Sequence, residues 1–234
     1  CDYCDFLSGP STRAGQEAYI YALLREIKAV SAVEKRSVDT VFIGGGTPSV
    51  PECDVMEKLL QGLQENFHFS PNAEITIEAN PGTLTSEKLA LYRKYGINRI
   101  SIGLQSPKDE ELEVLGRIHN YRQFLESYQM ARAAGFSNIN VDMMFAIPGQ
   151  SYEGWIENLR TVAELGPEHI SAYSLIVEEG TPFSKRELEL PDEDTEYRMY
   201  EDVAKVLGEY DYHQYEISNY AKENRECRHN EGYW

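Results

Sequence analysis

Short apolar runs alternate along this chain with longer segments in which apolar residues recur at helical spacing. The pattern predicts strands at 38–43, 74–78, 99–104, 139–145 and 169–177, and a weaker strand at 212–217. It predicts helices at roughly 15–34, 52–66, 85–95, 120–134, 152–165 and 193–209. Because strands that alternate with helices form parallel sheets, we expect an α/β fold, a partial TIM-like barrel of the (β/α)6 type.

Polar residues interrupt four of these strands near their carboxyl ends. The segments are VFIGGGTP, ITIEANP with Glu78, ISIGLQS with Gln105, and VDMMFAIP with Asp142. In a parallel barrel the ligand chemistry lies at the carboxyl ends of the strands. We therefore expect four neighbouring strands to direct polar groups at one opening.

Composition and charge narrow the function. The 234 residues carry a formal net charge of -17, which disfavours binding of nucleic acid because non-specific affinity for it comes from Lys and Arg. The sequence contains no apolar run of about 18 residues and no basic leader, so we expect a cytoplasmic protein. It opens on Cys1 rather than Met, which predicts a natural start further upstream and hence an N-terminally truncated barrel.

Two thiols lie within one loop turn in the segment CDYC, at Cys1 and Cys4. Such spacing suits a metal or an iron-sulfur cluster, half a zinc site, or a redox dithiol. Zinc is disfavoured because no second CxxC or HxxxH supplies the remaining ligands, although Cys227 and His229 form a distant pair. From the residues alone these alternatives stay open.

Each of the other polar motifs also has a structural reading. The glycines of GGGTP leave backbone that a ligand can approach, or they form a tight turn. Glu78 binds a cation or caps a turn, Asp142 needs a partner because it lies within an apolar run, and Arg117 suits a solvated helix end. The final segment CRHNEGYW offers Cys and His as axial ligands for heme iron, or it closes a core with aromatic side chains.

Taken together and in order, these motifs resemble the HemN/HemW group of radical S-adenosylmethionine (SAM) proteins. The matching segments are CDYCDF, GGGTPS, IEANPGT, SIGLQS followed by Arg117, NVDMMFAIPGQ, YHQYEISNYA and CRHNEGYW. The resemblance runs along essentially the whole chain. It implies a radical SAM barrel at 1–211 and a C-terminal extension at 212–234, before a helical domain that this sequence does not include.

The resemblance also implies a 4Fe-4S cluster on a CxxxCxxC loop. Cys1 and Cys4 match its second and third cysteines, and the first lies four residues upstream of Cys1. By position, the SAM contacts implied are Tyr3, Gly45, Gly46, Thr47, Glu78, Gln105, Arg117, Asp142 and Ile176. Among these, Asp142 is implied to meet the ribose hydroxyls, and Tyr3 and Ile176 to meet the adenine mainly through backbone.

Two functions compete within this group. One is a heme chaperone that delivers heme to acceptor proteins, and the other is the oxygen-independent coproporphyrinogen III oxidase, an enzyme of porphyrin biosynthesis. The chaperone is favoured because the oxidase loop carries one further cysteine shortly after the third, whereas Asp5 and Phe6 follow Cys4 here. The stretch from His229 to Trp234 also resembles the HNxxYW signature of the chaperone.

The resemblance implies that heme binds at His229, Asn230 and Tyr233, with Cys227 as an alternative ligand of the iron. It implies no catalytic residue, and whether the protein is an enzyme stays open. The implied partners are heme or a porphyrin and heme-acceptor proteins, with membrane contact only through such a client, and a monomer and dimer equilibrium.

Overall fold

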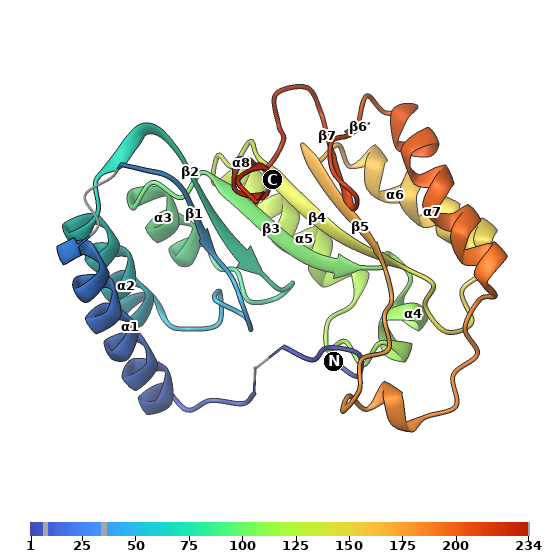
Figure 1. Ribbon diagram of the computed structural model, residues 1–234, viewed down its shortest axis with the longest axis horizontal. Helices are drawn as coiled ribbons and strands as arrows, with labels where there is room; N and C mark the ends of the chain where they lie inside the picture. Colours follow the sequence, from blue (N-terminus) through green and yellow to red (C-terminus); the bar gives the residue numbers. More distant parts are fainter. Residues whose placement is uncertain (7–8, 34–36, 234) are drawn as a thin grey trace.

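A computed structural model describes residues 1–6, 9–33 and 37–233 of the chain, and its centre is a curved sheet wrapped by helices (Figure 1). The strands hydrogen-bond in the order β1-β2-β3-β4-β5-β7-β6. Their bounds are β1 Val38–Ile43, β2 Phe69–Ala79, β3 Arg99–Gln105, β4 Ile139–Phe145, β5 His169–Ser174, β6 His213–Gln214 and β7 Asn219–Ala221. Strands β1 to β5 are parallel, which confirms the prediction of a partial barrel. Its sixth position holds an antiparallel pair, β7 and β6.

Most helices cover the outer face of the sheet, whereas the short helix α8 lies beside β1 toward the starts of the strands (Figure 1). The helices are α1 Arg13–Val33, α2 Cys53–Asn66, α3 Ser86–Lys94, α4 Asp109–Val114, α5 Tyr121–Ala133, α6 Tyr152–Glu164, α7 Glu193–Gly208 and α8 Arg228–Glu231, with a 3₁₀ turn at Phe183–Lys185. Side-chain oxygens of Thr85, Asn120, Ser151 and Asp192 cap four of them by accepting backbone N–H groups, which fixes where these helices begin. No helix in the described ranges is long and apolar enough to cross a membrane.

The structure differs from the sequence prediction at a few elements. β2 begins five residues before the predicted 74, and the segment predicted at 212–217 keeps only two residues of strand. β5 ends at Ser174 because Leu175 leaves the sheet and packs into a small apolar cluster. Helices α4 and α8 and strand β7 were not predicted, since each is too short for a periodic pattern to register. Residue 34, the end of the first predicted helix, lies outside the described residues, and the boundary at 211 stays a prediction.

The two faces of β3 have opposite chemistry, and this division positions the site. Ile100, Ile102 and Leu104 are fully buried in the core between the sheet and its helices. The alternate positions hold Arg99, Ser101, Gly103 and Gln105, which line the inside of the curved sheet. Because successive side chains of a strand point to opposite faces, the inner face is polar while the outer face is apolar.

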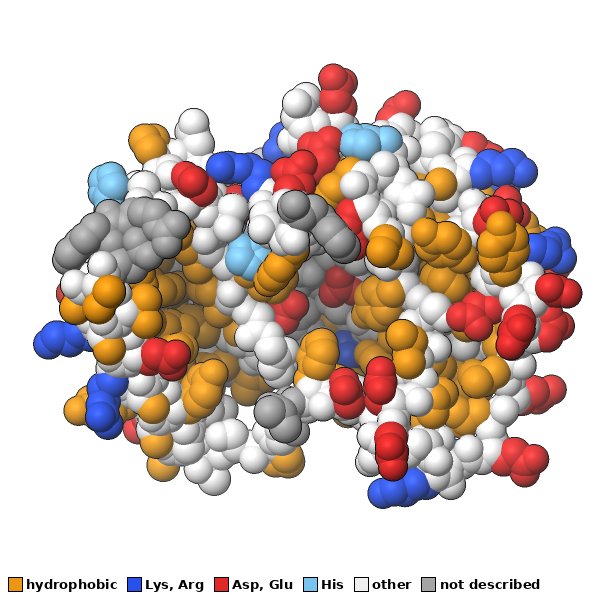
Figure 2. All heavy atoms as spheres, viewed as in Figure 1, with side chains coloured by type: hydrophobic (Ala, Val, Ile, Leu, Met, Phe, Trp, Pro, Cys, Tyr) orange, Lys and Arg blue, Asp and Glu red, His pale blue; other side chains and the backbone are white. Residues whose placement is uncertain are grey.

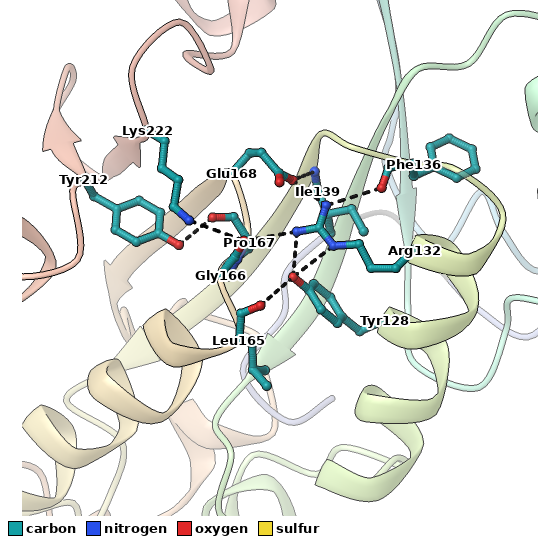
Figure 3. Close-up of polar contacts among 10 residues, drawn as sticks. All are labelled: Tyr128, Arg132, Phe136, Ile139, Leu165, Gly166, Pro167, Glu168, Tyr212 and Lys222. Carbon is teal, nitrogen blue, oxygen red and sulfur yellow. Dashed lines mark hydrogen bonds and ion pairs between the residues drawn. The ribbon is translucent and has the colours of Figure 1, made fainter.

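A polar cluster ties the strand starts to the helices at the end of the sheet remote from the polar motifs (Figure 3). Arg132 of α5 donates to Glu168 Oε2 at 2.7 Å and to the carbonyl of Gly166 at 3.1 Å. The hydroxyl of Tyr128 donates to the carbonyl of Leu165 and accepts from Arg132. Arg132 therefore closes the loop between α6 and β5 onto α5.

We expect Arg132→Met to lower the free energy of unfolding by about 2 kcal/mol, because it leaves a mostly buried carboxylate at Glu168 without its cation. Urea denaturation followed by circular dichroism measures the change. Arg160→Met is the matched control, since its ion pair with Glu209 is about half exposed and such pairs stabilise little. Equal effects of the two substitutions would contradict this role for Arg132.

Candidate functional site

An open cavity of about 830 Å³ occupies the inside of the curved sheet. Figure 2 looks into this hollow, where acidic and basic side chains are visible below the rim. Its wall brings together Cys1, Tyr3, Cys4, Gly45, Gly46, Thr47, Glu78, Gln105, Arg117, Asp142, Ile176 and Asn230. The other heme candidates, His229 and Tyr233, and the alternative ligand Cys227 do not line it. The expectation that the polar motifs of four strands share one opening is therefore confirmed.

The cysteine segment is fastened beside the carboxyl ends of the strands by its backbone. Asp2 donates its N–H to the carbonyl of Leu115, and its own carbonyl accepts the N–H of Phe183 at 2.9 Å. The Asp2 carboxylate also pairs with Arg186 at 2.6 Å. At Gly116, which has a φ of +66°, an added Cβ would lie 2.8 Å from the Asp2 carboxyl group. The thiols on either side of Asp2 are thus positioned by contacts that exclude a side chain at residue 116.

A row of hydrogen bonds runs from Cys1 to the glycine-rich loop. Arg117 donates to Cys1 Sγ at 3.3 Å and to Asn80 Oδ1 at 2.8 Å. The amide of Asn80 then donates to Thr47 Oγ1 at 2.9 Å. Asn80 is a residue that the sequence reading missed, although it follows Glu78 closely in IEANP. It links three of the candidate residues, Cys1, Arg117 and Thr47, into one row of hydrogen bonds.

Glu78 accepts the N–H of Gly45 at 3.0 Å, and a Cβ on Gly44 would lie 2.9 Å from its Oε2. The glycine loop thus folds onto the carboxylate, and the loop's conformation needs glycine at residue 45, where φ is +107°. Burial, and then the negative charge of Asp142, raise the pKa of Glu78 to about 7. A cation placed beside Glu78 would stabilise its ionised form.

Gln105 ends β3 in a strained conformation, with φ of +71° at a residue that is not glycine. It is buried, and its Nε2 donates to the hydroxyl of Tyr173 at 3.5 Å. Its Oε1 has no partner among the described residues, and neither has the buried Nε of Arg117. Backbone strain and buried polar atoms without a protein partner are common at ligand-binding sites, and here they fit a polar cofactor such as SAM.

Asp142 accepts the amide N–H of Asn140 at 2.6 Å and the hydroxyl of Ser101 at 3.3 Å. Burial raises its pKa, while these hydrogen bonds and the charge of Arg99 oppose the rise. An acid within an apolar strand was expected to need a partner. The hydrogen-bond partners of Asp142 are two neutral side chains, Asn140 and Ser101, on the same inner face.

The C-terminal segment covers the inner face near the strand starts. His229 stacks on Phe42 with ring centroids 5.2 Å apart, and its Nδ1 lies 2.9 Å from Thr40 Oγ1. Its Nε2 lies 3.4 Å from the hydroxyl of the exposed Tyr233. Asn230 faces the cavity. Trp234, the last residue of the HNxxYW-like stretch, lies outside the described residues.

Cys227 is fully buried, and its Sγ donates to Glu74 Oε1 at 3.4 Å. Burial raises the pKa of this thiol. Metal ligation requires a thiolate, which this raised pKa disfavours. Because Cys227 is fully buried, iron could reach its Sγ only if α8 moved. In the part of the chain that the structure describes, no three His, Cys, Asp or Glu side chains converge on a metal site. Cys1 and Cys4 therefore need a further ligand to hold a cluster.

The chain is similar in sequence to known proteins. Residues 1–162 match the family described as the Radical SAM superfamily. The chain is 39% identical to the heme chaperone HemW of Haemophilus influenzae and 39% identical to that of Escherichia coli, over its whole length in both cases. It spans 63% and 62% of those two proteins.

Among solved structures, the chain resembles the coproporphyrinogen III oxidase HemN of Escherichia coli, described as a radical SAM enzyme. The TM-score is 0.87 at 25% identity, over 96% of this chain and 53% of that one.

The raised pKa of Glu78 makes the stability of the cofactor-free protein depend on pH. The carboxyl group ionises near 4.5 when unfolded and near 7 when folded, so its contribution to stability is present below pH 4.5 and is lost as pH rises through 7. We expect the stability gained by Glu78→Gln to grow by about 1 kcal/mol between pH 6.0 and 8.5, measured by urea denaturation.

Glu57→Gln is the control for this measurement. The hydrogen bond from Lys94 lowers the pKa of Glu57, so that group stays ionised throughout the range and its substitution should have the same effect at both pH values. A stability difference for Glu78→Gln that did not change with pH would contradict the raised pKa.

Proposed function

The chain belongs to the radical SAM superfamily, and we propose that it is the SAM-binding barrel of a heme chaperone of the HemW type. The observation that carries the proposal is the single cavity that gathers both cysteines and all nine residues expected to contact SAM. The chain spans less than two thirds of its HemW relatives, so heme delivery is a proposal for the whole protein.

Cys1 and Cys4 would hold a 4Fe-4S cluster together with a third cysteine upstream of Cys1. When bound and reduced, such a cluster supplies the electron that cleaves SAM to methionine and a deoxyadenosyl radical. Arg117 holds the Cys1 thiol by a hydrogen bond, and Asp2 fixes the segment between the two thiols. These residues orient the cluster loop over the open end of the sheet, while the cofactors supply the chemistry.

In this proposal, different cavity residues contact different groups of the SAM molecule. Glu78, at the glycine loop, receives the ammonium group, whose positive charge favours the ionised carboxylate. Gln105 Oε1 accepts a hydrogen bond that no described residue provides. Asp142 accepts the ribose hydroxyls, while Tyr3 and Ile176 border the adenine.

Heme is proposed to bind at α8, with His229 facing the iron and Asn230 and Tyr233 orienting the site. His229 can present a ring nitrogen only if Tyr233 or Thr40 gives up its contact. The longer of the two contacts is the 3.4 Å one to Tyr233, which is 76% exposed. Nε2 is therefore the proposed ligand atom.

The carrier is preferred over the oxidase on two grounds. Asp5 and Phe6 stand where the oxidase loop carries a further cysteine. The relatives at 39% identity are named heme chaperones, whereas the oxidase is 25% identical.

The proposed location is the cytoplasm, because the structure describes all four cysteines as unpaired thiols. The proposed partners are heme-acceptor proteins, and a dimer is proposed alongside the monomer.

The proposal predicts that the full-length protein, reconstituted anaerobically, takes up about four irons per chain, binds SAM and binds one heme. His229→Ala should weaken heme binding at least tenfold without changing SAM affinity, as measured by absorbance titration. Thr40→Val is the control, because it removes only the Nδ1 contact and should leave heme affinity nearly unchanged. Conversion of coproporphyrinogen III by the same preparation would overturn the carrier role.

The cluster loop itself can be tested through Gly116. Gly116→Ala should lower the iron content after reconstitution several-fold, because the added methyl group would displace Asp2 and the thiols beside it. Gly135→Ala is the matched control, since its φ of +87° imposes a similar backbone strain and no atom lies within 4 Å of the added Cβ. Equal iron loss in both variants would show that strain alone is responsible.

A further inference from the structure

Arg99 is a buried cation on the inner wall of the cavity that the SAM contacts do not use. The residue is 2% exposed, and it is the first residue of β3. Gln105 ends the same strand, about 20 Å further along at the usual rise of a strand. Both residues line the cavity, so the cavity extends along β3 well beyond the carboxyl end where SAM is proposed to bind.

The guanidinium of Arg99 has no hydrogen-bond or ion-pair partner within residues 1–6, 9–33 and 37–233, and its Nε is buried without one. The other arginine of this wall, Arg117, is held by Cys1, Asn80 and the carbonyl of Gly103. A guanidinium carries five N–H donors, and burying one unpaired is costly. Arg99 is therefore placed to bind a group that enters from the cavity.

The charges around Arg99 leave room for an anion. Asp142 attracts it but forms no ion pair with it, and the Asp142 oxygens already accept hydrogen bonds from Asn140 and Ser101. Burial, and then the charge of Arg99, keep the pKa of His169 well below 6.5, so that ring is neutral. Glu74, a buried carboxylate two positions before the β2 partner of Arg99, accepts hydrogen bonds from Cys227, Arg228 and His229 and forms no ion pair with Arg99. None of these neighbours supplies the bidentate carboxylate that a guanidinium binds best.

We propose that Arg99 is a carboxylate-binding position on the inner wall, and that it receives a propionate group of the bound tetrapyrrole. The inference rests on the proposed function, because it names the part of the ligand that this wall recognises. Asn230, from the proposed heme segment, lines the same cavity as Arg99. The ligands of both competing functions, heme and coproporphyrinogen, carry propionates, so the carboxylate is the chemistry that they share.

The test compares two probes on the full-length protein reconstituted with cluster and SAM: hemin with free propionates, and hemin dimethyl ester. The unmodified protein should bind the free acid about tenfold tighter or more, as expected for a charge-assisted hydrogen bond. Arg99→Met should bring the ratio close to one, and Arg99→Lys should retain part of it. The SAM affinity of both variants should stay within about threefold of the unmodified value.

Arg160→Met, on the outer surface, is the control for an arginine-to-methionine change. Equal binding of acid and ester by the unmodified protein would overturn the inference alone, and this comparison does not depend on a variant that folds. Loss of SAM affinity in Arg99→Met with the acid preference retained would assign Arg99 to SAM and also overturn it. Binding of neither probe would overturn the proposed function, and the inference with it.

Discussion

The constraint on which the structure depends is that the inner face of the sheet is polar and, near the strand starts, largely buried. A polar group in such a place must find a partner, since an unpaired one costs free energy. Several of these groups meet this demand in one connected network, whereas Arg99 does not. Asn140 donates to Asp142, His169 contacts Asn140 at 2.6 Å, and Tyr215 contacts His169 at 2.8 Å. The network thus spans β4 and β5 and reaches the C-terminal segment.

The chemistry of its members fixes the direction of this network. Asn140 donates its amide hydrogens to Ser101 and Asp142, so its oxygen must accept, and His169 therefore carries its proton on Nδ1. The Nε2 of a neutral His169 then accepts the hydroxyl hydrogen of Tyr215. The Tyr215 oxygen in turn accepts from the N–H of Cys227 and the amide of Asn230. Every donor points toward Asp142, which stabilises a negative charge there and links the proposed ribose contact to α8.

The parts of the site that the sequence could predict are those where a polar residue interrupts an apolar strand. Glu78, Gln105 and Asp142 stand out because burial makes such residues expensive unless they serve a purpose, and all three face the cavity. The five parallel strands were predictable for the same reason, since buried strands read as apolar runs. Arg99 went unnoticed because an arginine at the first position of a strand looks like an ordinary boundary residue.

What the sequence could not predict is set by contacts between distant residues. Thr40 and His229 are 189 positions apart, and no local pattern indicates that α8 returns to cover β1. His169 likewise begins a strand, and only its contacts with Asn140 and Tyr215 mark it as part of the inner wall. Helix α8 contacts β1 at this end of the cavity, and its Asn230 lines the cavity together with Arg99 and Asp142. The segment that resembles a heme-binding motif therefore also forms part of the wall of the polar cavity.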